Sequence, residues 1–123
     1  MVKGMSMSEP PKNYRELLLY ALVKVVNARD SITYVGDDVE LYEQFTRYYS
    51  SIIGLINIAS PHIKEPEKYI HRCREAWKEF DPNEKDEYGR PKLYLPRGAS
   101  RLDEVMRDLI KELASVIGLG KEP

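Results

Sequence analysis

Cysteine and histidine are scarce in this sequence of 123 residues. Cys73 is the single cysteine, so the chain cannot form an internal disulfide, which fits a reducing compartment. His62 and His71 are the two histidines, and neither belongs to a Glu-x-x-His pair of the kind that di-metal helical bundles use. We therefore expect neither a metal nor a cofactor, and histidine offers few candidates for general-base catalysis.

An excess of charge of one sign and long apolar runs are also missing. Lys and Arg number 19 and Asp and Glu number 20, for a net charge of -1. No overall field therefore favours nucleic acid or an acidic membrane. No apolar run approaches the roughly 20 residues that a transmembrane helix needs, and the N-terminal residues lack the apolar core of a signal peptide. These observations predict a cytoplasmic protein with no membrane partner.

The sequence also lacks the motifs of common enzymes, and it contains few residues with side-chain amides. The sequence has no glycine-rich phosphate loop, no nucleophile elbow and no paired-cysteine site, so we expect a protein that is not an enzyme. Charged residues make up 32% of the chain, whereas glutamine occurs once, as Gln44, and asparagine four times. This balance is typical of proteins from thermophiles.

What is present is helical periodicity. Apolar residues recur every three or four positions in the segments 13–30, 37–60, 66–80 and 100–117. Asp37 or Asp38 can cap the second segment, and Pro66 is suited to the first position of the third. Ser100 followed by Asp103 resembles a capping box at the start of the fourth. The sequence therefore predicts an all-α protein, a four-helix bundle.

The segments outside these helices complete the predicted organisation. We expect a disordered leader at 1–11, a single helical domain at 12–119 with a long loop at 81–99, and a tail at 120–123. Two short runs rich in β-branched, aromatic and leucine residues, 32–35 and 92–95, are candidates for a minor two-stranded ribbon beside the bundle. The loop is unusually long for a compact domain, which favours a binding role for part of it.

The densest cluster of reactive residue types lies in the third segment, at His71 and Cys73. Two residues apart on a helix, their side chains point about 200° away from each other. Cys73 then belongs to an apolar arc with Trp77, whereas His71 lies on the charged side between Glu67 and Glu75. A surface metal site on that charged side is the alternative, but we interpret Cys73 as a small core residue and His71 as a solvated one.

The first helix has more apolar surface than one side of a bundle requires. Its polar residues form a single narrow stripe, and almost every other position is apolar. Either the helix is central in the domain or its second apolar face is covered by another chain. Leu19, Val23 and Val26 are the candidates for such an interface. We therefore predict a non-catalytic interaction or assembly module, as a homo-oligomer or a small subunit of a larger complex.

A basic segment, 90–101, supports the alternative function of nucleic-acid binding. It contains no acid, and its aromatic and cationic residues are suited to stacking a base and holding phosphates. The simpler reading is that the basic half of the loop pairs with the acidic half before it. A small enzyme of unknown reaction is the second alternative. The anion- or nucleic-acid-binding candidates are Arg90, Lys92, Tyr94, Arg97, Ser100 and Arg101.

Overall fold

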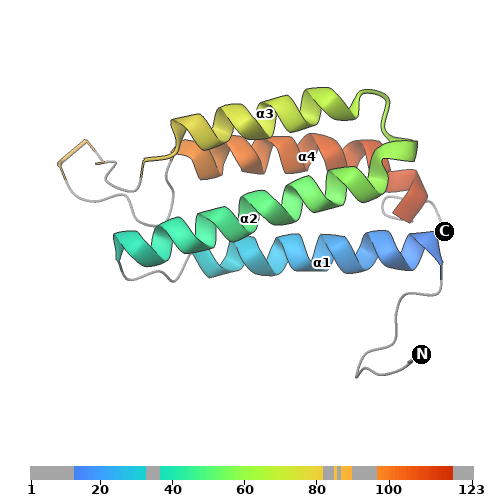
Figure 1. Cartoon of the computed structure of the whole chain (residues 1–123), viewed down its shortest axis with the longest axis horizontal. Coiled ribbons are helices and arrows are strands. Elements are labelled where there is room, and N and C mark those ends of the chain that lie inside the picture. Colours follow the sequence, from blue (N-terminus) through green and yellow to red (C-terminus); the bar gives the residue numbers. More distant parts are fainter. Residues whose placement is uncertain (1–12, 33–36, 82–84, 86, 90–96, 118–123) are drawn as a thin grey trace, which may run out of the picture.

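The four predicted helices form an antiparallel bundle in the computed structural model, which describes residues 13–32, 37–81, 85, 87–89 and 97–117. The helices are α1 (Tyr14–Ile32), α2 (Asp38–Ala59), α3 (Pro66–Glu79) and α4 (Arg97–Ile117), and a 3-10 turn, η2 (Ser60–His62), follows α2. Consecutive helices run in opposite directions (Figure 1). The prediction of an all-α four-helix bundle is confirmed.

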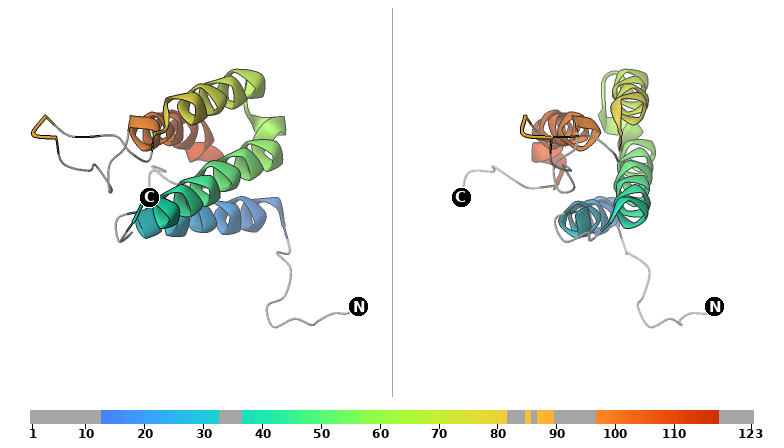
Figure 2. Two further views of the ribbon diagram at one scale, coloured as in Figure 1. Left: turned by 60° about the vertical axis from the view of Figure 1, so that its left-hand side comes forward. Right: turned by 90° about the vertical axis from the view of Figure 1, so that its left-hand side faces the viewer.

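The bundle consists of two helix pairs. Helix α1 packs mainly on α2, and α3 mainly on α4, while α2 also contacts α3 and α4 (Figure 2). The core between them is formed by side chains from all four helices, among them Leu18, Ile52, Cys73 and Leu109. Within the part of the chain that is described, no helix combines the length and the apolar character that crossing a membrane requires.

Local sequence accounts for most helix ends. Asn13 precedes α1, and its Oδ1 accepts a hydrogen bond from the Glu16 amide at 2.8 Å. Asp37 caps α2 in the same way, with 2.8 Å to the Glu40 amide. Pro66 is the first residue of α3, as predicted, because proline needs no hydrogen-bond partner for its nitrogen there.

The start of α4 differs from the prediction. The helix begins at Arg97, so Ser100 is its fourth residue and not its N-cap, and the predicted capping box is wrong. Instead, the Asp103 carboxylate binds Arg29 and Tyr48. The physical reason for the earlier start is packing: Gly98 and Ala99 are buried, and Gly98 lies directly against the end of α3.

The end of α1 also differs from the prediction. Ile32 is fully buried as the last residue of α1, so it is not part of a strand. The other ribbon positions, 33–35 and 92–95, lie outside the described residues. The predicted leader, the tail and most of the predicted loop also lie outside the described residues. The last three residues of that loop, 97–99, belong to α4.

Candidate interaction surface and polar clusters

Helix α1 has one side in the core and an apolar side that the bundle leaves accessible. Its core side consists of residues that are at most 8% exposed, Leu18, Ala21, Val25, Ala28 and Ile32. On the other side, Val23 is 55% and Val26 48% exposed, and Leu19 and Leu22 are partly buried against the core. We call Leu19, Leu22, Val23 and Val26 the outer α1 face. All three interface candidates from the sequence belong to it.

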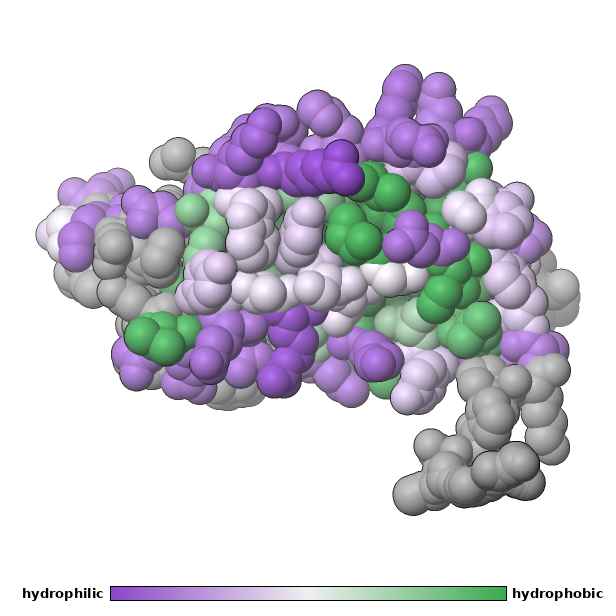
Figure 3. Space-filling model, in the orientation of Figure 1, coloured by the Kyte–Doolittle hydropathy of each residue, from purple (hydrophilic) through white to green (hydrophobic). Residues whose placement is uncertain are grey.

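The outer sides of the other helices differ from this one. Figure 3 shows the side of the molecule on which α2 and α3 lie toward the viewer, and hydrophilic residues gather there along α3. The other large hydrophobic residues of the helices with high exposure are Tyr20 of α1, at 55%, and Val39 and Tyr42 near the start of α2, at 70% and 48%. On α1, the exposed Val23 and Val26 adjoin the partly buried Leu19 and Leu22 at spacings of three and four, which places the four residues on one face of the helix.

A polar cluster joins three helices beside the core. The Asp103 carboxylate of α4 accepts hydrogen bonds from Arg29 Nε at 2.7 Å and Arg29 Nη2 at 3.1 Å, and from the Tyr48 hydroxyl at 2.6 Å. The hydrogen bond to Asp103 raises the pKa of Arg29, and burial raises the pKa of the Tyr48 hydroxyl. No proton is therefore available from either group near neutral pH, so the cluster is suited to holding helices together.

Sequence reasoning missed this cluster, although one signal was present. Tyr48 lies in the apolar stripe of α2, and a buried tyrosine hydroxyl normally has a hydrogen-bond partner. Which residue provides that partner depends on how α4 packs against α1 and α2. The periodicity of a single helix does not contain that information.

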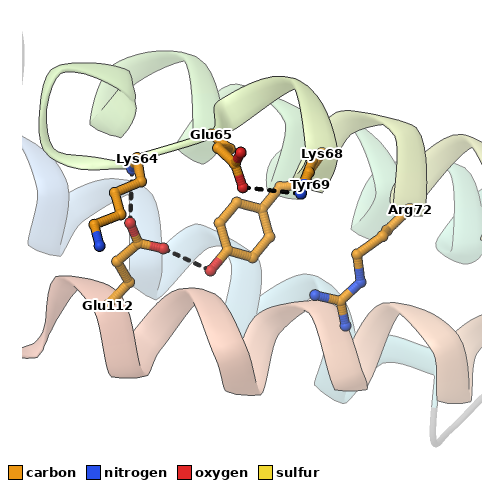
Figure 4. A pocket seen from close by; sticks show the side chains of 6 residues that line it. All are labelled: Lys64, Glu65, Lys68, Tyr69, Arg72 and Glu112. Carbon is orange, nitrogen blue, oxygen red and sulfur yellow. Dashed lines mark hydrogen bonds and ion pairs between the residues drawn. The ribbon is translucent and has the colours of Figure 1, made fainter.

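A surface hollow of about 400 Å³ lies between α3 and α4 (Figure 4). Its lining consists of Lys64, Glu65, Lys68, Tyr69, Arg72 and Glu112. The Glu112 carboxylate accepts a hydrogen bond from the Tyr69 hydroxyl at 2.8 Å and another from the Lys64 backbone amide at 2.7 Å. Through these two bonds, Glu112 of α4 holds the segment that leads into α3.

The charges around this hollow are mostly paired within the chain. Lys68 lies 3.1 Å from Glu65, and Arg72 lies 2.9 Å from Asp108. Burial and the bond to Glu112 raise the pKa of Tyr69 to about 12, and the Lys64 amide is the main cause that lowers the pKa of Glu112. Both shifts move away from neutral pH, the opposite of what a general acid or base requires. The hollow is a polar seam between two helices.

The two faces of α3 follow the prediction. Cys73 is fully buried, and burial raises the pKa of its thiol to about 12. The His71 side chain is 72% exposed, with Nε2 3.9 Å from a Glu75 carboxylate oxygen. Within the described ranges, no group of three or more His, Cys, Asp or Glu side chains is placed to hold a metal ion. The burial of Cys73 and the exposure of His71 are confirmed.

The basic segment is described only at its end. Arg90, Lys92 and Tyr94 lie outside the described residues, as does the side chain of Arg97. Ser100 is half-buried in α4. Arg101 is exposed, with Nε 3.0 Å from Glu79 and Nη1 4.0 Å from Glu104. Among the anion-binding candidates, Arg101 therefore forms ion pairs with acidic side chains of its own chain.

Comparison with protein-family models, with curated proteins and with solved structures finds no match. The surface geometry is therefore the basis of a functional conclusion. The outer α1 face is a set of neighbouring apolar side chains that the packing of the bundle does not account for. The main polar groups described above, Asp103 and Glu112, are instead engaged in hydrogen bonds that join neighbouring elements of the bundle.

Proposed function

We propose that this protein is a non-catalytic assembly module, a helical bundle that binds another protein chain through its outer α1 face. The supporting observation is the exposure of Val23 and Val26, at 55% and 48%, in the middle of a 19-residue helix that packs in the core with its other side. The bound chain is either a second copy or another subunit of a larger complex.

The energetic argument concerns apolar surface. A helix of a bundle needs one apolar stripe, which α1 already provides through Leu18, Val25 and Ile32. Removing further apolar side chains from water is favourable by about 25 cal/mol for each Å² buried, and the freedom that two chains lose on association offsets part of this gain. Valine and leucine at neighbouring helical positions therefore favour docking, whereas in a free monomer the same residues contribute little.

A pair of matched substitutions tests the proposal. Val23→Asp places a charge in the outer α1 face and should weaken association at least tenfold, measured by sedimentation equilibrium and by co-purification. Val39→Asp makes the same chemical change at an exposed valine of α2 and should leave association unchanged. Because both positions are exposed, both variants should fold. If Val23→Asp associates as the unmodified chain does, or if the chain binds no protein at all, the proposal fails.

Nucleic-acid binding by the basic segment remains the alternative prediction. It requires that charge reversal at Arg90, Lys92 and Arg97 abolish a salt-dependent gel shift. The described part of this segment adds no support, because Arg101 already pairs with Glu79. A shift that survives the charge reversal, or no shift at low salt, contradicts this alternative.

We also place the protein in the cytoplasm of a thermophile. The location is supported by the single cysteine, which is a buried thiol. The thermophile source is supported by the charged composition and by ion pairs that join α3 to α4, such as Arg72–Asp108. Unfolding temperature and cell fractionation of the native source check the two statements.

A further inference from the structure

We propose that the chain bound at the outer α1 face is a second copy of this protein, with the two α1 helices antiparallel across a two-fold axis. This inference rests on the proposed function, and it adds the identity of the partner and the alignment of the two helices. The order of side chains along α1 is the observation that carries it.

The outer α1 face is symmetric about its own centre. In an isologous dimer the same surface of each subunit meets across the axis, so each residue needs a suitable partner on the second copy. An axis that passes α1 between Leu22 and Val23 places Leu19 opposite Val26 of the second copy and Leu22 opposite its Val23. Every apolar residue of the face is then opposite another apolar residue.

The charges at the two ends of the outer α1 face are complementary in the same alignment. Arg15 and Asp30 are exposed and lie one at each end of the outer α1 face. The axis between Leu22 and Val23 places Arg15 opposite Asp30 of the second copy, and the dimer contains this pair twice. A parallel alignment would instead oppose Arg15 to Arg15 and Asp30 to Asp30. The sign of the two charges therefore favours the antiparallel pair.

Two further charged residues of α1, Lys24 and Arg29, are directed away from the outer α1 face. Lys24 lies toward α2, with its ammonium group 5.6 Å from the centre of the Tyr20 ring. Arg29 is held by Asp103 in its own chain. Two helical turns of apolar contact make a small interface, at the low end for specific association, so the dimer forms at high protein concentration.

A charge exchange between two variants tests both the partner and the alignment. Arg15→Glu alone and Asp30→Arg alone each oppose like charges twice, and each should weaken the dimer about fivefold at low salt. The double variant should regain the affinity of the unmodified chain. An equimolar mixture of the two single variants should form a heterodimer, because both of its charge pairs are attractive.

Disulfide trapping gives a second measurement that does not depend on weak charge effects. Leu19→Cys mixed with Val26→Cys should form a disulfide between the two variants under mild oxidation, whereas neither variant alone should. The native Cys73 does not interfere, because it is fully buried. Leu19→Cys mixed with Val39→Cys is the control and should form no cross-link.

The outcomes separate this inference from the proposed function. A dimer with the predicted charge pattern and cross-link supports both. A chain that stays monomeric but binds another protein, in a manner that Val23→Asp abolishes, supports the proposed function and overturns the second copy as the partner. A dimer that is insensitive to charge exchange and does not cross-link between positions 19 and 26 overturns the alignment.

Discussion

The guanidinium group of Arg29 in α1 donates two hydrogen bonds, of 2.7 and 3.1 Å, to the carboxylate of Asp103 in α4. The hydroxyl of Tyr48 in α2 donates a third to the same carboxylate. One acid therefore links three helices at a position where Arg29 and Asp103 are only 25% and 30% exposed. Bidentate pairs of this kind are the stronger class of ion pair.

Asp103→Asn should destabilise the fold, because it leaves the charge of Arg29 partly buried without a counter-ion. Allowing for partial exposure, we expect a loss of about 1–3 kcal/mol in the free energy of unfolding, measured by chemical denaturation. Tyr48→Phe, which removes one hydrogen bond, should cost about 1 kcal/mol. Glu67→Gln on the exposed side of α3 is the control and should stay within about 0.5 kcal/mol. Equal effects of Asp103→Asn and Glu67→Gln would contradict the role of the cluster.

Two glycines in helices provide a matched pair of substitutions. A Cβ atom at Gly98 would lie 2.7 Å from the Ala76 carbonyl oxygen and 2.9 Å from Phe80 Cβ, whereas one at Gly54 would meet nothing within 4 Å. Gly98→Ala should therefore separate α3 from α4 and cost about 1–3 kcal/mol. Gly54→Ala should stabilise the protein by about 0.5–1 kcal/mol through helix propensity. Thermal unfolding of both variants measures the difference, and a stabilising Gly98→Ala would show that the close approach is wrong.

Glu112 should contribute stability that depends on pH. The Lys64 amide and the Tyr69 hydroxyl lower its pKa below the ordinary 4.5, so the folded state prefers the ionised carboxylate. This contribution is present above the unfolded pKa and is lost as the pH falls through the lowered folded value. Glu112→Gln should thus lower the free energy of unfolding at pH 7 by less than about 1 kcal/mol, given its exposure, and by less still near pH 3. A difference between the two proteins that grew on acidification would contradict this assignment.

Substitution of Cys73 should lower stability, whereas substitution of His71 should have little effect. Cys73→Ala leaves a small cavity in the core and should cost about 1 kcal/mol, whereas His71→Ala should change stability by no more than about 0.5 kcal/mol. Because its thiol is buried with a raised pKa, Cys73 should react with an alkylating reagent at neutral pH only after unfolding. Rapid labelling of the folded protein would place Cys73 outside the core.

Particular residues show where sequence reasoning succeeded and where it did not. The seam of Cys73 and Trp77 on α3 followed from helical spacing, because a helix of known period presents a calculable face. The start of α4 at Arg97 did not, because Ser100 and Asp103 have the spacing of a local cap. The contact of Gly98 with the end of α3 extends the helix past that signal, and this contact joins residues about 20 positions apart.

The sequence by itself determined the existence of four amphipathic helices, their approximate ends and the excess of apolar surface on α1. These properties depend on side chains within a few turns of each other, which the 3.6-residue period relates directly. Only the tertiary structure decided that Asp103 binds Arg29, that Glu112 holds the entry to α3, and that Val23 and Val26 remain exposed while Val25 is buried. Each of these depends on which helix faces which, and that arrangement is set by packing among all four helices at once.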